Sequence, residues 1–166
     1  MGGCFCATFV SFRVFRGPRK NNDSGSFNNA VGAFALFHNI DGSDNNAFGN
    51  SALLENIHAS GNTALGDGAL YGNEMTGNGT ANNNTAVGAG TLNYNTDASG
   101  NTAVGFLVLL FNDMTGNGTG NNNTAVGSDA LFSNTDGGSN TAVGYQALQN
   151  STGDYNIALG AGTGTE

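Results

Sequence analysis

Few residues of this sequence could carry acid–base or nucleophilic chemistry. The only two histidines, His38 and His58, lie six and nine residues after a repeated glycine and so do not share one position. Serine and threonine hydroxyls are numerous, but no general base recurs beside them. An active site needs titratable groups that converge on one point. The sequence therefore predicts a protein that is not an enzyme, with no catalytic residue.

Acidic residues within turns raise the question of a calcium site. Asp67, Asp97, Asp129 and Asp136 lie among Asn and Gly, but calcium needs a dense set of oxygen ligands at fixed spacing. Only Asp97 and Asp136 recur at one place in a repeated unit, and the calcium-solenoid phrase Gly-Gly-x-Gly-x-Asp is absent. We therefore expect solvated turn acids, with no bound metal and no cofactor.

Charge is divided along the chain. All four basic residues lie in the first twenty positions and all twelve acidic residues follow them, so residues 21–166 carry a formal charge of −12. Such a surface repels phosphate backbones and anionic membranes. No stretch approaches the roughly 20 apolar residues of a membrane span. The sequence thus predicts neither a nucleic-acid partner nor membrane insertion by this chain.

A short phrase, Asn-Thr-Ala-Val-Gly, recurs eight times, four times in full and four times as a variant. The glycines that close successive phrases are 17, 17, 22, 17, 22, 17 and 16 residues apart. Repetition at this period is typical of a solenoid, in which each unit stacks on its neighbours. The repeat glycines are Gly32, Gly49, Gly66, Gly88, Gly105, Gly127, Gly144 and Gly160.

Each repeat predicts two short strands separated by turns. The first is the Thr-Ala-Val segment, and the second is centred on an Ala-Leu pair that begins three residues after the glycine. Gly and Asn, 28 and 27 of the 166 residues, suit the intervening turns because both tolerate positive φ. We therefore predict an all-β parallel solenoid of about eight coils over residues 28–166, with a sheet on each side. The predicted core is Val31, Leu36, Phe48, Leu53, Leu65, Leu70, Val87, Leu92, Val104, Leu109, Val126, Leu131, Val143, Leu148 and Leu159.

The two long repeats contain turn-rich insertions at residues 75–80 and 114–119. Both insertions contain Asn-Gly, a strong turn signal, and leave the following phrase intact. They should therefore project from one corner of the coil. Their tips, Asn78 and Gly79 in one and Asn117 and Gly118 in the other, are the predicted contact residues.

The predicted core is thin for a single chain. Each repeat offers about one Val, one Leu and two Ala, which barely offsets the entropy of ordering so much Gly and Asn. The small Ala beside each Val favours a face that neighbouring chains cover. The alternative is that Ala simply fills a narrow monomeric solenoid.

The phrase Asn-Thr-Ala-Val-Gly-x-x-Ala-Leu, with its Asn, Thr and Gly turns, resembles the head repeats of trimeric autotransporter adhesins of the YadA type and related repeats of phage tail fibres. The resemblance covers residues 28–164, although the repeats here are longer than those usual in YadA-type heads. It implies a left-handed parallel β-roll that assembles as a homotrimer. It also implies an extracellular setting, on a cell surface or a virion fibre, and attachment to a host protein or glycan.

A second interpretation rests on threonine. Thr63, Thr85, Thr102, Thr124 and Thr141 each precede the Ala of a phrase, and a flat ladder of Thr can bind ice. Ice-binding solenoids usually place two Thr around the small residue, whereas here one of the two is Val. The alternative is that Thr and Asn form hydrogen-bonded ladders that close the coil. A third class, the β-helix polysaccharide lyases, is disfavoured because the repeats contain no Lys or Arg.

Aromatic residues also recur, with Phe37, Tyr71 and Phe132 after the Leu and Phe106 and Tyr145 after the Gly. We expect them to pack at coil ends or between chains. A stripe that contacts a receptor or glycan is the alternative.

Residues 1–27 do not share the repeat and form a leader, a docking segment or a cap. Their Cys4 and Cys6 are too close for an unstrained disulfide and too few for a zinc site. The apolar stretch lacks the preceding basic residues of a secretory signal.

Overall fold

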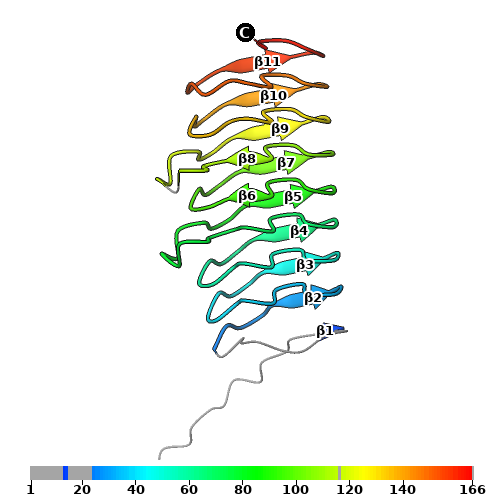
Figure 1. The fold of residues 1–166 in the computed structure, drawn as a ribbon, viewed down its shortest axis with the longest axis vertical. Coiled ribbons are helices and arrows are strands. Elements are labelled where there is room, and N and C mark those ends of the chain that lie inside the picture. Colours follow the sequence, from blue (N-terminus) through cyan, green and yellow to red (C-terminus); the bar gives the residue numbers. More distant parts are fainter. Residues whose placement is uncertain (1–12, 15–23, 116, 166) are drawn as a thin grey trace, which may run out of the picture.

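The chain folds into a rod of stacked coils. The computed structural model describes residues 13–14, 24–115 and 117–165. These residues form an all-β structure without a helix, and the strands are parallel. About eight turns of solenoid lie along the long axis (Figure 1). The predicted β-solenoid is confirmed.

One nine-stranded sheet runs the length of the rod. Each strand pairs in register with the same phrase of the next coil, so that Thr85 lies beside Thr102 and Val87 beside Val104. Its order is β1-β2-β3-β4-β5-β7-β9-β10-β11. These strands are β1 (Arg13–Val14), β2 (Asn29–Val31), β3 (Asn46–Phe48), β4 (Thr63–Leu65), β5 (Thr85–Val87), β7 (Thr102–Val104), β9 (Thr124–Val126), β10 (Thr141–Val143) and β11 (Ile157–Leu159).

The second sheet is much smaller than predicted. It contains only β6 (Tyr94–Asn95) and β8 (Phe111–Asn112). The Ala-Leu segments are turns, because the Leu of each adopts a positive φ, for example 51° at Leu92. Their amides still pair with the next coil, as Leu92 N–H donates to the Val108 carbonyl at 2.9 Å. The prediction of a strand at each Ala-Leu pair is therefore wrong.

The core contains alanine and leucine but not the predicted valine column. The Ala of every phrase is buried, as are the leucines of the second phrase: Leu36, Leu53, Leu70, Leu92, Leu109, Leu131 and Leu148. In a strand only alternate side chains face one side, so an inward Ala turns both of its neighbours outward. The core prediction is wrong for that outward set: Val31, Phe48, Leu65, Val87, Val104, Val126, Val143 and Leu159.

This arrangement also corrects the expectation that neighbouring chains cover the alanines. Ala86 and Ala103 are fully buried inside the single chain. Alanine therefore fills a narrow solenoid, which was the alternative interpretation. The small Cβ matters because the coil walls lie close together.

The repeat glycines stack directly on one another. Gly88 has φ +127°, and a Cβ there would lie 1.7 Å from the carbonyl oxygen of Gly105. All eight repeat glycines have φ between 118° and 143°, a region that other residues rarely adopt. Glycine is therefore needed at this corner of each coil.

The sheet begins before residue 28. Arg13–Val14 pairs with β2, with Arg13 opposite Ala30 and Val14 opposite Val31. The segment that the sequence sets apart thus contributes the first strand. Cys4 and Cys6 lie outside the described residues.

We predict that Gly88→Ala lowers the free energy of unfolding by about 3 kcal/mol, because the new Cβ collides with the backbone of the next coil at an unfavourable φ. The matched control is Gly162→Ala. Gly162 also has positive φ, +65°, but a Cβ there meets no heavy atom within 4 Å, so we expect a loss of about 1 kcal/mol. Urea unfolding followed by circular dichroism measures both. Equal losses would contradict the stacking constraint.

Candidate functional site

A column of buried asparagines runs along the nine-stranded sheet, each at the residue immediately before a strand. Each Asn precedes the strand of its phrase, and its Oδ1 accepts a hydrogen bond from the backbone amide of the equivalent Asn in the next coil. Asn84 accepts in this way from Asn101 at 2.9 Å, and Asn101 from Asn123 at 2.8 Å. The side-chain amide of Asn84 donates to the Ala98 carbonyl at 2.9 Å. The column therefore crosslinks successive coils and closes each turn.

A second buried asparagine column lies directly beside the first, and the side-chain amide of Asn101 donates across to Asn95 Oδ1 at 3.4 Å. Asn112 donates from Nδ2 to Asn95 Oδ1 at 2.7 Å and to the Gly120 carbonyl at 2.9 Å, and its Oδ1 accepts from Asn134 at 2.8 Å. The members are Asn39, Asn56, Asn73, Asn95, Asn112 and Asn134. Asparagine side chains therefore form the hydrogen-bonded ladders that were predicted as the alternative to an ice-binding surface. By fixing each coil on the next, these ladders hold the outward face and the insertions in place.

The outward face of the long sheet carries two parallel rows. One row contains the five predicted threonines, which are half-buried or exposed. The other, which we call the apolar row, consists of Val31, Phe48, Leu65, Val87, Val104, Val126, Val143 and Leu159. Val104 and Val126 are each 37% exposed, and Leu65 is 51% exposed. The two rows flank the buried alanines and share one regular surface.

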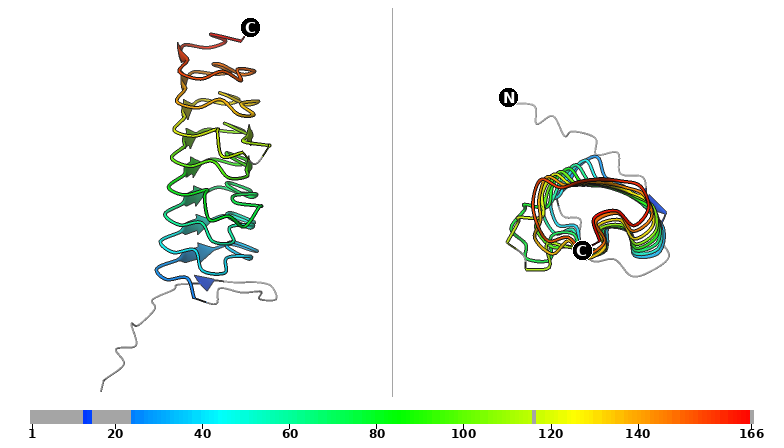
Figure 2. Two further views of the ribbon diagram at one scale, coloured as in Figure 1. Left: turned by 90° about the vertical axis from the view of Figure 1, so that its left-hand side faces the viewer. Right: turned by 90° about the horizontal axis from the view of Figure 1, so that it is seen from above.

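Both insertions project sideways from the same corner of the rod. They stand apart from the stacked coils when the molecule is viewed down its axis (Figure 2). The side chains of Asn78 and Asn117 are exposed, while Gly79 and Gly118 are half-buried. The structure thus brings the four predicted contact residues to one side of the molecule.

Each insertion is held at its base by a buried acid that the sequence analysis did not select. Glu74 precedes the first insertion and accepts hydrogen bonds from the backbone amides of His58, Ala59 and Gly79. Asp113 precedes the second and accepts from Asp97 N–H at 2.9 Å and Gly118 N–H at 3.1 Å. Burial raises the pKa of the Asp113 carboxyl above its ordinary value, and these amides oppose the shift. Both acids stand immediately before the phrase Met-Thr-Gly-Asn-Gly-Thr. This shared position is the feature of the sequence from which their role could have been predicted.

The four acids considered for calcium do not form one cluster. Asp67 is exposed and accepts from the Asn50 amide at 2.9 Å. Asp97 and Asp136 each accept from an insertion threonine, Thr76 at 2.5 Å and Thr115 at 2.6 Å. Asp97 is buried, whereas Asp129 and Asp136 are half-buried. In the part of the chain that the structure describes, no group of three or more His, Cys, Asp or Glu could hold a metal ion.

Each histidine pairs with an acid of a neighbouring coil. His38 Nδ1 lies 2.6 Å from Glu55 Oε2, and His58 Nδ1 lies 2.6 Å from Asp41 Oδ1. Within each pair the acid and the histidine are 17 residues apart, one coil, and therefore occupy one column. The two histidines themselves occupy different columns, as the sequence indicates. Paired across coils on a partly exposed surface, they crosslink the solenoid.

The aromatic residues divide between stacking and exposure. Phe132 meets Phe111 edge-on with ring centroids 5.4 Å apart, and Phe37 meets Phe34 at 5.6 Å. Phe106 and Tyr145, in contrast, are each 55% exposed, and Tyr71 is 36% exposed. The set predicted from the repeat therefore does not form one continuous stripe.

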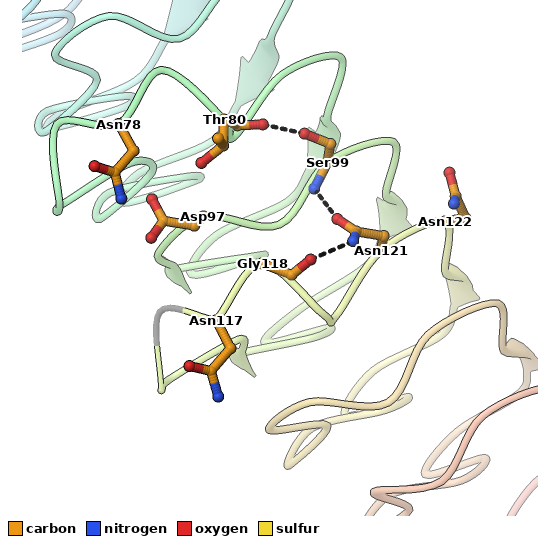
Figure 3. Close-up of a pocket in the computed structure, with 8 residues that line it drawn as sticks. All are labelled: Asn78, Thr80, Asp97, Ser99, Asn117, Gly118, Asn121 and Asn122. Atoms are coloured by element: carbon orange, nitrogen blue, oxygen red, sulfur yellow. Dashed lines mark hydrogen bonds between the residues drawn. The ribbon is translucent and has the colours of Figure 1, made fainter.

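A polar hollow lies between the insertions. Its volume is about 410 Å³, and its lining includes Asn78, Thr80, Asp97, Asn117 and Asn121 (Figure 3). Ser99 N–H donates to Asn121 Oδ1 at 2.6 Å across this wall. Hydroxyl, amide and carboxylate side chains line the hollow, and no large apolar side chain is among them.

No helix among the described residues is long and apolar enough to span a membrane. Comparison of the chain with protein-family models, with curated proteins and with solved structures finds no significant match. The features of the molecule that could serve a function are the rod, its flat outward face and its projecting insertions.

We predict that Asn112→Ala destabilises the rod by about 3 kcal/mol. The substitution removes three buried hydrogen bonds at once, to the Gly120 carbonyl, to Asn95 Oδ1 and from an Asn134 amide hydrogen. The Gly120 carbonyl keeps only the longer bond from Asn123, at 3.1 Å, and Asn95 Oδ1 only that from Asn101, at 3.4 Å. Asn150→Ala, at an exposed position near the end of the array, should change stability by less than about 0.5 kcal/mol. Thermal and urea unfolding of both variants test this. A loss below 1 kcal/mol at Asn112 would contradict a structural role for the ladder.

Proposed function

We propose that this chain is a non-catalytic structural and adhesive module, a rigid rod that assembles as a homotrimer and presents its insertions for attachment. The observation that carries the proposal is the apolar row, which continues across all eight repeats on one regular face. Contiguous exposed apolar surface usually marks an interaction site. Three copies are expected because the phrase resembles the head repeats of trimeric adhesins.

The physical advantage of assembly follows from the narrow core. Alanine and one leucine per coil leave the single chain with little buried apolar volume. Covering the exposed part of each row residue would contribute about 1 kcal/mol, or several kcal/mol for eight positions. The acidic exterior would keep separate rods apart. The chain would work outside the cell, on a cell surface or a virion fibre.

Ice binding is the second candidate, and one observation favours it. The threonine row faces outward in register beside the apolar row, with Thr85, Thr102 and Thr124 on successive strands of the sheet. Ice binding would need this face to be free, whereas assembly would cover it. The threonine row is also short of the full length of the sheet, because Asn29 and Asn46 precede Thr63 in it and Ile157 follows Thr141.

Light scattering should give a mass near three times 16.7 kDa for the chain at neutral pH. The triple variant Val104→Thr, Val126→Thr and Val143→Thr keeps β-branched side chains but removes apolar contact, and it should dissociate at concentrations where the native chain is associated. The matched control exchanges the other row, Thr102→Val, Thr124→Val and Thr141→Val, and should keep the mass. A monomeric native chain would refute assembly.

Thermal hysteresis measured on the same proteins tests the ice-binding candidate. That candidate expects hysteresis from a monomeric native chain, an increase in the Val→Thr variant and loss in the Thr→Val variant. If the rod is the trimer proposed, the native chain should show none. Hysteresis from the native chain would make ice binding the better account.

Attachment should depend on the insertions. A variant with both insertions shortened by five residues, to the 17-residue spacing of the other repeats, should keep the oligomeric mass and lose binding to host cells or arrayed glycans. Because the solenoid phrases stay intact, a loss assigns contact to the insertions. Unchanged binding would move the contact surface to another face.

A further inference from the structure

Asp97 contains a buried oxygen without a hydrogen-bond partner. The residue is 4% exposed, and Oδ1 accepts from Thr76 Oγ1 at 2.5 Å. Oδ2 is buried and has no partner among the described residues. A buried carboxylate oxygen without a compensating contact is costly.

A second buried acid, Asp113, contacts the backbone of Asp97. Asp113 Oδ2 accepts the backbone N–H of Asp97 at 2.9 Å, so two buried acidic residues adjoin one another. Lys and Arg are absent from the sequence after residue 20. No basic side chain of the repeats can therefore neutralise the pair, and a cation from solution would serve that purpose.

Side chains that carry oxygen line the hollow beside Asp97. Asp97 lines the hollow between the two insertions, and in Figure 3 its carboxylate points toward the side chain of Asn78. Asn117 lies across the hollow on the second insertion, where its exposed side chain points away from Asp97 in Figure 3 and would have to turn to reach an ion beside Asp97. Thr80 also lines the hollow. No Cys or His lines this hollow. Carboxylate, amide and carbonyl oxygens are the ligands that suit hard divalent cations.

We propose that this hollow binds a calcium-class divalent cation, with Asp97 Oδ2 as the anchoring ligand and with Asn78, Asn117 and water supplying further oxygens. Ca²⁺ accepts six to eight oxygens in flexible geometry, whereas Mg²⁺ demands a near-ideal octahedron and releases its water reluctantly. With one direct carboxylate, the dissociation constant should be on the order of 10⁻⁴ to 10⁻³ M. The ion would tie the first insertion to the second.

This site does not depend on the oligomeric state, because it lies at the corner of the coil and not on the flat face. Asp136 supplies a matched control within the chain. It occupies the equivalent place in its repeat and accepts from Thr115 as Asp97 does from Thr76. Asp136 differs from Asp97 in two ways. It is half-buried, and the position equivalent to Asp113 in the following coil is occupied by the uncharged Thr152.

The test is a thermal unfolding and calorimetric titration of the full chain with CaCl₂ up to about 10 mM, at constant ionic strength and protein concentration. We expect one ion per chain and a rise in Tm of about 3–10 °C, with a smaller rise for MgCl₂. Asp97→Asn should abolish the response, and Asp136→Asn should retain it. Asn117→Ala, an exposed position that should not affect folding, should weaken binding about tenfold and keeps the test decisive if Asp97→Asn fails to fold.

Several results would overturn the site. They are no heat and no Tm rise with the native chain, an undiminished response in Asp97→Asn, and unchanged binding in Asn117→Ala. Equal responses to Ca²⁺ and Mg²⁺ in all variants would indicate diffuse screening of the acidic surface, and would also overturn it.

Discussion

Stacking of one coil on the next is the constraint on which the whole molecule depends. A coil of 16 to 22 residues turns several times, and each turn leaves backbone amides and carbonyls that cannot pair within a strand. The buried asparagines resolve this, because one side chain both accepts and donates. Asn84 links the Asn101 amide to the Ala98 carbonyl. Every coil therefore needs the coil beside it, and the rod is stable only as an array.

The narrow coil then dictates which apolar residues lie inside. The strand face that packs inward admits alanine, and leucine fills the remaining space from a turn with positive φ. Larger side chains such as Phe48 and Leu65 are left on the outer face. The tight packing that stabilises a single chain thus also leaves the apolar row exposed on its outer face, where another molecule could cover it. Covering that row by other copies and leaving it free for ice are mutually exclusive uses.

The absence of basic residues gives the acids an unusual structural role. Backbone amides compensate the buried carboxylates of Glu74 and Asp113, and these contacts hold the insertions to the rod. The insertions are therefore fixed at their bases while Asn78 and Asn117 stay exposed. Asp97 departs from this pattern, because one of its oxygens has no partner among the described residues. The departure lies between the two projecting insertions, where any added ligand would couple them.

The sequence by itself determined the solenoid, its coil boundaries, the repeat glycines, the leucine column and the projecting insertions. Equivalent positions in stacked coils have the same surroundings and therefore tend to hold the same residue type, so the repeat period identifies these features directly. Only the tertiary structure decided which way each strand faces. Thr-Ala-Val fits either orientation, and the close approach of the coil walls selects alanine for the interior. It likewise decided that Ala-Leu is a turn, and that Glu74, Asp113 and Asp97 lie buried beside the insertions. Those acids are buried by contacts with neighbouring coils. Such contacts depend on how the coils are aligned in three dimensions, and the alignment cannot be read from composition or repeat spacing.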